Sequence, residues 1–90
     1  MNLPDFLTQD AHGDIRLTGH RIGLFHVVRA YNDGCSPQEL AAEFPTLPLA
    51  LIQQVITFYL ENRPEVDDYV TRYQADLDRQ RDLASRRKYI

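Results

Sequence analysis

Few side chains in this sequence have the types and spacing that catalysis or metal binding requires. The three histidines, His12, His20 and His26, show neither the i, i+3 nor the i, i+4 spacing of a helical metal site. Asp67 and Asp68 are adjacent, so a helix would turn them about 100° apart, and they could not work as a paired acid and base. The sequence therefore predicts a protein that is not an enzyme and that needs no metal or cofactor.

The one cysteine, Cys35, cannot form an internal disulfide, which is typical of a reducing compartment. It stands just before a predicted helix, whose N-terminus can lower the pKa of a thiol. The sequence places no base within its reach, so we interpret Cys35 as a small turn residue rather than as a nucleophile.

Two groups of polar side chains could contact nucleic acid. Basic side chains suited to phosphate lie within the first thirty residues: Arg16, His20, Arg21 and Arg29. Side chains that could face base edges share one arc of a predicted helix: Gln53, Gln54 and Thr57. Residues 31–62 contain four acidic residues and no Lys or Arg, so phosphate contacts would have to come from outside this segment. The alternative interpretation is that the arginines are solvated charges and the glutamines a hydrated helix face.

Length and composition restrict the class of protein. Ninety residues make one domain with a small core, and 43% hydrophobic with 26% charged residues is ordinary for a folded chain. The longest apolar stretch is far short of the roughly 20 residues that span a bilayer, and residues 1–30 show no secretory signal. We therefore expect a cytoplasmic protein that does not enter a membrane.

A small β-hairpin is predicted near the beginning of the chain. Residues 6–8 and 15–17 are short strand candidates, and Gly13 between them can take the positive φ that a turn needs. Two strands alone are only marginally stable in water, so this hairpin must pack against other elements.

Four helices are predicted to follow the hairpin. Their expected ranges are 24–33, 36–44, 48–62 and from Pro64 onward. Gly34 would end the first helix, and the run Ser36-Pro37-Gln38-Glu39 combines an N-cap serine, a proline at the first helical position and a capping-box glutamate. The second and third helices form a helix-turn-helix arrangement, with the hairpin as a wing. The predicted fold is mainly α: a small N-terminal β-hairpin followed by a helix-turn-helix bundle of three helices and a long C-terminal helix.

Apolar residues in the second half of the chain predict contacts with other proteins. The third helix carries an apolar arc about twice as wide as that of an ordinary surface helix, and further aromatic residues follow it, which predicts a homodimer. In the fourth helix the apolar stripe fades after Leu77. We therefore divide the chain into a winged helix-turn-helix-like domain over 1–77 and a helical or flexible extension over 78–90. The side chains expected to bind a partner are Tyr69, Tyr73, Leu77 and Leu83.

Four short runs together resemble one bacterial family. They are Ile15-Arg16-Leu17-Thr18-Gly19-His20-Arg21-Ile22, Asp33-Gly34-Cys35-Ser36-Pro37-Gln38-Glu39-Leu40, Phe44-Pro45-Thr46-Leu47 and Val55-Ile56-Thr57-Phe58-Tyr59-Leu60. Their combination resembles the bacterial domain of unknown function numbered four-three-three, a group of antitoxin-like, winged helix-turn-helix proteins. Two positions depart from the family's pattern: His20 stands where a small hydroxyl residue is usual, and Pro48 where a capping side chain usually opens the third helix.

The resemblance implies a function as one half of a toxin–antitoxin pair. Such a protein would bind and neutralise a PIN-like ribonuclease toxin, and it would repress its own operon, with operator DNA as a second partner. The alternatives are a stand-alone helix-turn-helix transcriptional regulator and a dimeric adaptor that does not bind DNA.

Overall fold

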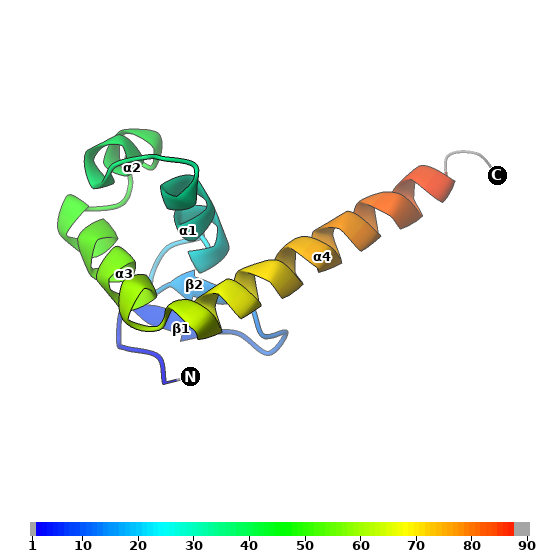
Figure 1. Ribbon diagram of the computed structural model, residues 1–90, viewed down its shortest axis with the longest axis horizontal. Coiled ribbons are helices and arrows are strands. Elements are labelled where there is room, and N and C mark those ends of the chain that lie inside the picture. Colours follow the sequence, from blue (N-terminus) through cyan, green and yellow to red (C-terminus); the bar gives the residue numbers. More distant parts are fainter. Residues whose placement is uncertain (1, 88–90) are drawn as a thin grey trace.

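Short strands and helices follow one another in the order that the sequence pattern predicts (Figure 1). The computed structural model describes the backbone of residues 2–87 and the side chains of residues 2–82. Within this part the elements are β1 (Leu7–Gln9), β2 (Ile15–Leu17), α1 (Leu24–Asn32), α2 (Pro37–Glu43), α3 (Leu49–Glu61) and α4 (Arg63–Arg87). The mainly helical class with an N-terminal hairpin is confirmed. None of the described helices combines the length and the apolar character that a membrane span requires.

The hairpin turns its apolar side toward the helices. Leu7 pairs with Leu17 and Gln9 with Ile15 in an antiparallel register, and Gly13 in the connecting turn has a φ of +89°. Leu7, Ile15 and Leu17 are buried, as the alternation of residues along a strand requires. The first strand begins one residue later than predicted, at the leucine that lies opposite Leu17.

Local capping residues set the helix ends. Gly34 follows α1 with a φ of +105°, a conformation that favours glycine. At the start of α2 the Glu39 N–H donates to the Ser36 hydroxyl oxygen at 3.2 Å, and the Ser36 N–H donates to the Glu39 carboxylate at 3.2 Å, so the predicted capping box is confirmed. Helix α3 follows Pro48, which offers it no side-chain cap.

Helix α3 is the centre of the core and packs against α1, α2 and α4. Most of its wide apolar arc is buried within this one chain: Ile52, Val55, Ile56, Phe58 and Tyr59. Leu49 and Leu60 stay exposed, at 39% and 48%. The chain's own elements therefore cover most of the surface from which the homodimer is predicted.

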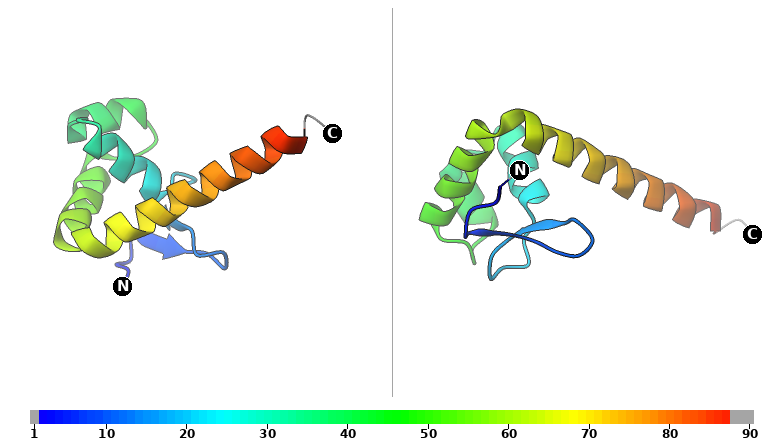
Figure 2. Two further views of the ribbon diagram at one scale, coloured as in Figure 1. Left: turned by 45° about the vertical axis from the view of Figure 1, so that its right-hand side comes forward. Right: turned by 90° about the horizontal axis from the view of Figure 1, so that it is seen from below.

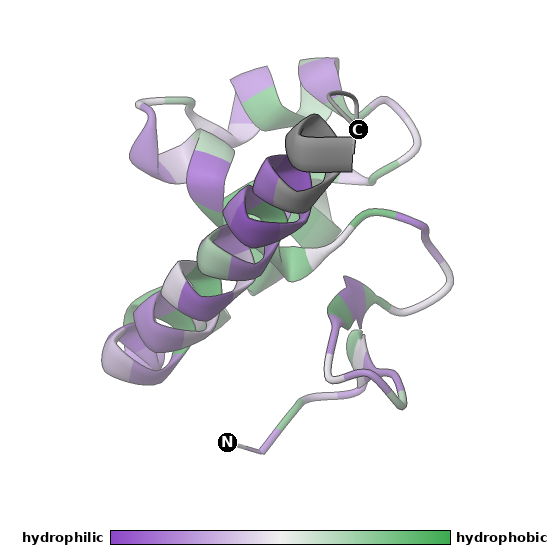
Figure 3. Cartoon of the chain, turned by 90° about the vertical axis from the view of Figure 1, so that its right-hand side faces the viewer, coloured by the Kyte–Doolittle hydropathy of each residue, from purple (hydrophilic) through white to green (hydrophobic). Residues whose placement is uncertain are grey.

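The C-terminal half of helix α4 projects away from the rest of the molecule. Figure 1 and both views of Figure 2 show its C-terminal half extending beyond the other helices and the hairpin. Val66 in its first turns is buried, and Tyr69, Val70, Tyr73 and Leu77 are half-buried. Before the turns drawn in grey, the outer part of the helix is mostly hydrophilic, as Figure 3 shows. The predicted boundary after residue 77 thus falls inside one unbroken helix.

The hydroxyl of Tyr59 connects three helices. It donates to Asp67 Oδ1 of α4 at 2.6 Å and accepts from Asn32 Nδ2 of α1 at 3.2 Å, while the residue is only 1% exposed. The Arg63 guanidinium lies 5.8 Å from the centre of the Tyr59 ring, and its Nε is 3.9 Å from Asp67 Oδ2. A buried polar group with its partners in place therefore holds the angle at which α4 leaves α3.

Replacing Tyr59 by Phe tests this junction. The substitution keeps the ring but removes a donor from Asp67 and an acceptor from Asn32, so we expect the free energy of unfolding to fall by about 1 kcal/mol. Urea titration followed by circular dichroism measures the change. Tyr31→Phe is the matched control, because the Tyr31 ring meets Tyr59 edge to face and its hydroxyl makes no hydrogen bond with the described residues. Equal losses in the two variants would contradict the assignment.

Candidate functional site

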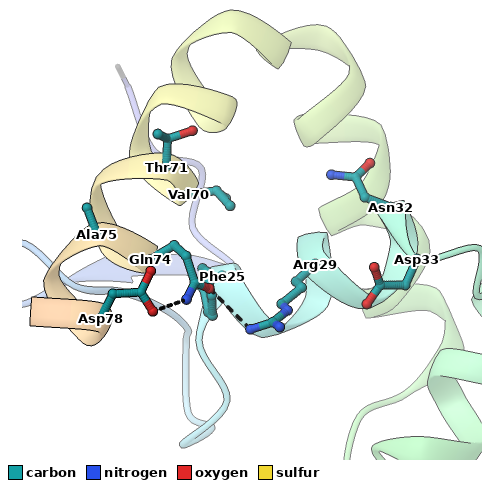
Figure 4. A pocket seen from close by; sticks show the side chains of 9 residues that line it. All are labelled: Phe25, Arg29, Asn32, Asp33, Val70, Thr71, Gln74, Ala75 and Asp78. Atoms are coloured by element: carbon teal, nitrogen blue, oxygen red, sulfur yellow. Dashed lines mark hydrogen bonds between the residues drawn. The ribbon is translucent and has the colours of Figure 1, made fainter. Parts of the chain in front are cut away.

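An open groove of about 590 Å³ lies between α1 and α4. Its lining residues are Phe25, Arg29, Asn32 and Asp33 on the α1 side and Val70, Thr71, Gln74, Ala75 and Asp78 on the α4 side (Figure 4). Phe25 is buried at the base and Val70 is half-buried, whereas Ala75 and Asp78 are exposed. The groove therefore has an apolar base and charged rims.

Two contacts hold the walls of this groove in place. The rings of Phe25 and Tyr73 stack with their centres 4.6 Å apart and an interplanar angle of 28°. Arg29 Nη1 donates to Gln74 Oε1 at 3.2 Å, and Gln74 Nε2 donates to Asp78 Oδ1 at 3.0 Å, as the dashed lines in Figure 4 show. The Arg29 guanidinium also lies 5.8 Å from the Phe25 ring centre. Arg29, predicted to contact phosphate, thus takes part in the bridge across the groove.

The rim of the groove next to α2 is acidic. Asp33 makes no ion pair or side-chain hydrogen bond with the described residues, and Arg29 is the one cation among the lining residues.

The pKa of the Cys35 thiol, outside the groove, is raised above its ordinary value. The largest cause is partial burial, and the negative charges of Glu39, Glu43 and Asp33 add to it. These carboxylates disfavour the thiolate form and oppose the lowered pKa that the helix N-terminus alone would favour.

Two of the other predicted phosphate contacts lie in a separate hollow. Arg16 and Arg21 line a space of about 320 Å³ between the hairpin, α1 and α4, together with His26. Arg16 Nη2 is 3.3 Å from Asp10 Oδ2, whereas Arg21 is exposed and its side chain has no partner among the described residues. His20 lines neither space. Within the described residues, no three His, Cys, Asp or Glu side chains are placed to hold a metal ion.

The predicted base-reading residues form a third surface. The exposed face of α3 presents Gln53, Gln54 and Thr57. They line a hollow of about 530 Å³ together with Phe6, which lies just before β1. The lining includes Glu61 but no Lys or Arg. The structure therefore brings the two glutamines and the threonine together but places the arginines in different hollows.

The predicted partner-binding tyrosines serve mainly to attach α4 to its own chain. The Ile15 N–H donates to the Tyr69 hydroxyl oxygen at 2.8 Å, and burial raises the pKa of Tyr69. Tyr73 stacks on Phe25, as described above. Leu77 is half-buried in a small hollow near His12. Leu83 lies outside the residues whose side chains the structure describes.

Of the nine residues that line the groove, only Arg29 was named as a site residue from the sequence, and Phe25, Gln74 and Ala75 are among those that were missed. Phe25 lies beside the apolar stripe of α1 rather than on it, and a large aromatic in that position could have indicated a second packing surface. Gln74 and Ala75 carry no such signal, because only the angle between α1 and α4 makes them part of a groove.

The fold defines a small, mainly helical domain with a two-stranded N-terminal hairpin. The sequence model of the family described as "Protein of unknown function (DUF433)" matches residues 9–59, more than half of the chain, and the chain belongs to this family. Comparison with curated proteins and with solved structures found no match.

The turn of the hairpin contains a carboxylate with a shifted pKa. Partial burial would raise the pKa of Asp10, but hydrogen bonds from the backbone N–H groups of Asp14 and His12, at 3.0 and 2.8 Å, and the charge of Arg16 lower it overall. The folded state therefore favours the ionised carboxylate. Its contribution to stability is present at neutral pH and is lost as pH falls through the lowered pKa.

Asp10→Asn tests this coupling. The amide can still accept from the turn but has no charge for Arg16, so we expect the variant to be less stable than the parent at neutral pH. Below about pH 4 the carboxyl of the unfolded chain takes up a proton first, and the difference should shrink as pH falls further, through the lowered pKa of the folded state. Urea titrations across this pH range measure it, with Asp5→Asn as an exposed control in the same segment. A difference that stays constant with pH would exclude the charge as its source.

Proposed function

We propose that this protein is an antitoxin-like partner that binds and neutralises a PIN-like ribonuclease toxin and represses its own operon. Its resemblance to antitoxin-like proteins supports the proposal. The single structural observation that carries it is the length of α4, which runs for 25 residues, or about 37 Å, and extends past its contacts with the domain.

The outer part of α4 is exposed over the residues whose side chains the structure describes. We call residues 78–90 the arm. Within its described part all five side chains, at positions 78–82, are exposed. Arg79 pairs with Asp76 on the same helix, a local contact of a kind that adds little stability. A short, exposed helical segment is marginal in water, so a bound partner would stabilise it.

Charge is divided unequally between the domain and the arm. Residues 1–77 hold five basic and eleven acidic residues, for −6, and the arm holds five basic and two acidic residues, for +3. A ribonuclease must present a basic surface to RNA, and the acidic domain complements such a surface. The arm would then contact a less basic or apolar part of the toxin.

Truncation after Leu77 tests the role of the arm. We expect the shortened protein to keep a helical circular dichroism spectrum and nearly its melting temperature, because the described side chains that are removed, at positions 78–82, are exposed. Co-expression with the toxin-like reading frame beside its gene, followed by co-purification, should show strongly reduced toxin binding. A chain lacking only residues 88–90 serves as the matched control. If the truncated protein binds the toxin as well as the full chain does, the arm has no role in toxin binding. If truncation unfolds the protein, the arm is needed for the fold instead.

A stand-alone transcriptional regulator is the second candidate function. It is favoured by the pairing of α2 with α3 and by the exposure of Gln53, Gln54 and Thr57 on one face of α3. A homodimer, which we also propose, would present two such faces to the half-sites of an operator. Leu49 and Leu60, which remain exposed, are available for self-association.

DNA binding can be tested with single arginine substitutions. We expect Arg21→Ala to reduce the salt dependence of binding to DNA from upstream of the gene by about one unit of slope, because its guanidinium is free to meet phosphate. Arg29→Ala should leave the slope unchanged, since Gln74 holds this side chain in another groove. Fluorescence anisotropy at several salt concentrations gives both slopes. Equal effects of the two substitutions would contradict the placement.

A further inference from the structure

We infer that the groove between α1 and α4 is the docking site for one amphipathic helix of the toxin partner, with apolar residues facing the base of the groove and a Lys or Arg facing its acidic rims. This inference rests on the proposed function and adds the place and the chemistry of contact. The partner helix would lie beside α1 and α4 and complete a bundle with them.

The shape of the groove suits a helix. Its α4 wall runs from Val70 to Asp78, a length of about 12 Å or somewhat more than two helical turns. Val70, which is half-buried, and Ala75, which is exposed, offer apolar surface beside the buried ring of Phe25. Ala75 is also small enough to let a neighbouring backbone approach. The stacked ring of Tyr73 and the Arg29–Gln74 bond hold the walls without a partner, so little reorganisation is needed on binding.

The charges of the groove call for a cation on the occupant. Within the described residues, Asp33 has no side-chain partner, and Asp78 accepts a hydrogen bond from Gln74 alone. The one guanidinium in the lining, that of Arg29, is already bonded to Gln74. Residues 31–62 contain no Lys or Arg, so no cation of that segment competes for Asp33. A basic residue of the partner would therefore meet unneutralised carboxylates on both rims.

A second copy of this chain fits the groove less well. Its own arm has complementary charge, but residues 78–82 are all polar, and the apolar residues that follow are divided by the polar run at 85–88 into the pairs Leu83-Ala84 and Tyr89-Ile90. The arm therefore lacks the continuous apolar stripe that an amphipathic helix would lay along the groove. The toxin helix is thus the occupant that satisfies both the apolar base and the acidic rims.

Ala75→Glu tests the docking site, with Ala50→Glu as the matched control. Both alanines are exposed on helices, so the fold should survive either change, but only Ala75 lines the groove. The probe is the product of the adjacent toxin-like reading frame in a catalytically inactive form, and its affinity is measured by calorimetry. We expect Ala75→Glu to weaken binding at least about tenfold and Ala50→Glu to leave it unchanged. Asp33→Asn should weaken binding less and reduce its salt dependence.

Each outcome decides between the proposals. If the unmodified protein does not bind the toxin, the proposed function fails and the docking site fails with it. If it binds and Ala75→Glu binds equally well, the docking site alone is overturned. If Ala75→Glu instead lowers the mass of the protein in sedimentation equilibrium without toxin, a second copy occupies the groove, and this also overturns the inference. Selective loss of toxin binding with an unchanged mass supports it.

Discussion

The hydroxyl of Tyr59 is the contact on which the arrangement of the helices depends. Helices α3 and α4 are separated by the single residue Asn62, so a small change of angle at that point would move the far end of α4 by many ångströms. A hydrophobic core alone is tolerant of such changes, because apolar contacts have little directional preference. The short hydrogen bond to Asp67 and the one from Asn32 are directional, and together they select one angle.

Two further contacts hold α4 along its first three turns. The Ile15 N–H of the hairpin bonds to Tyr69, and the ring of Phe25 in α1 stacks on Tyr73. The hairpin, which is too small to be stable alone, is thus used to support a helix that would otherwise be held by α1 and α3 only. As a result the groove and the base of the arm belong to one rigid framework, although they come from segments far apart in the sequence.

Local features of this fold could be predicted from the sequence, and the groove could not. The capping box at Ser36, the end of α1 at Gly34 and the exposed face of α3 all depend on neighbours within a few residues, and all three agree with the structure. The bond between Arg29 and Gln74 joins positions 45 residues apart and follows from the angle between two helices. For the same reason the two tyrosines of α4 looked available to a partner in the sequence, whereas in the structure they are used within the chain.

The unbroken course of α4 has a consequence for the lifetime of the protein. A helix opens from its unsupported end inward, and here opening is resisted first at Leu77 and then more strongly at Tyr73. Along this helix, a protease specific for basic residues would therefore find Arg79 and Arg81 before Arg72 and Arg63, which lie nearer the domain. Cleavage there would leave a domain that is still folded but lacks its arm, so loss of the arm and loss of the fold would proceed at separate rates.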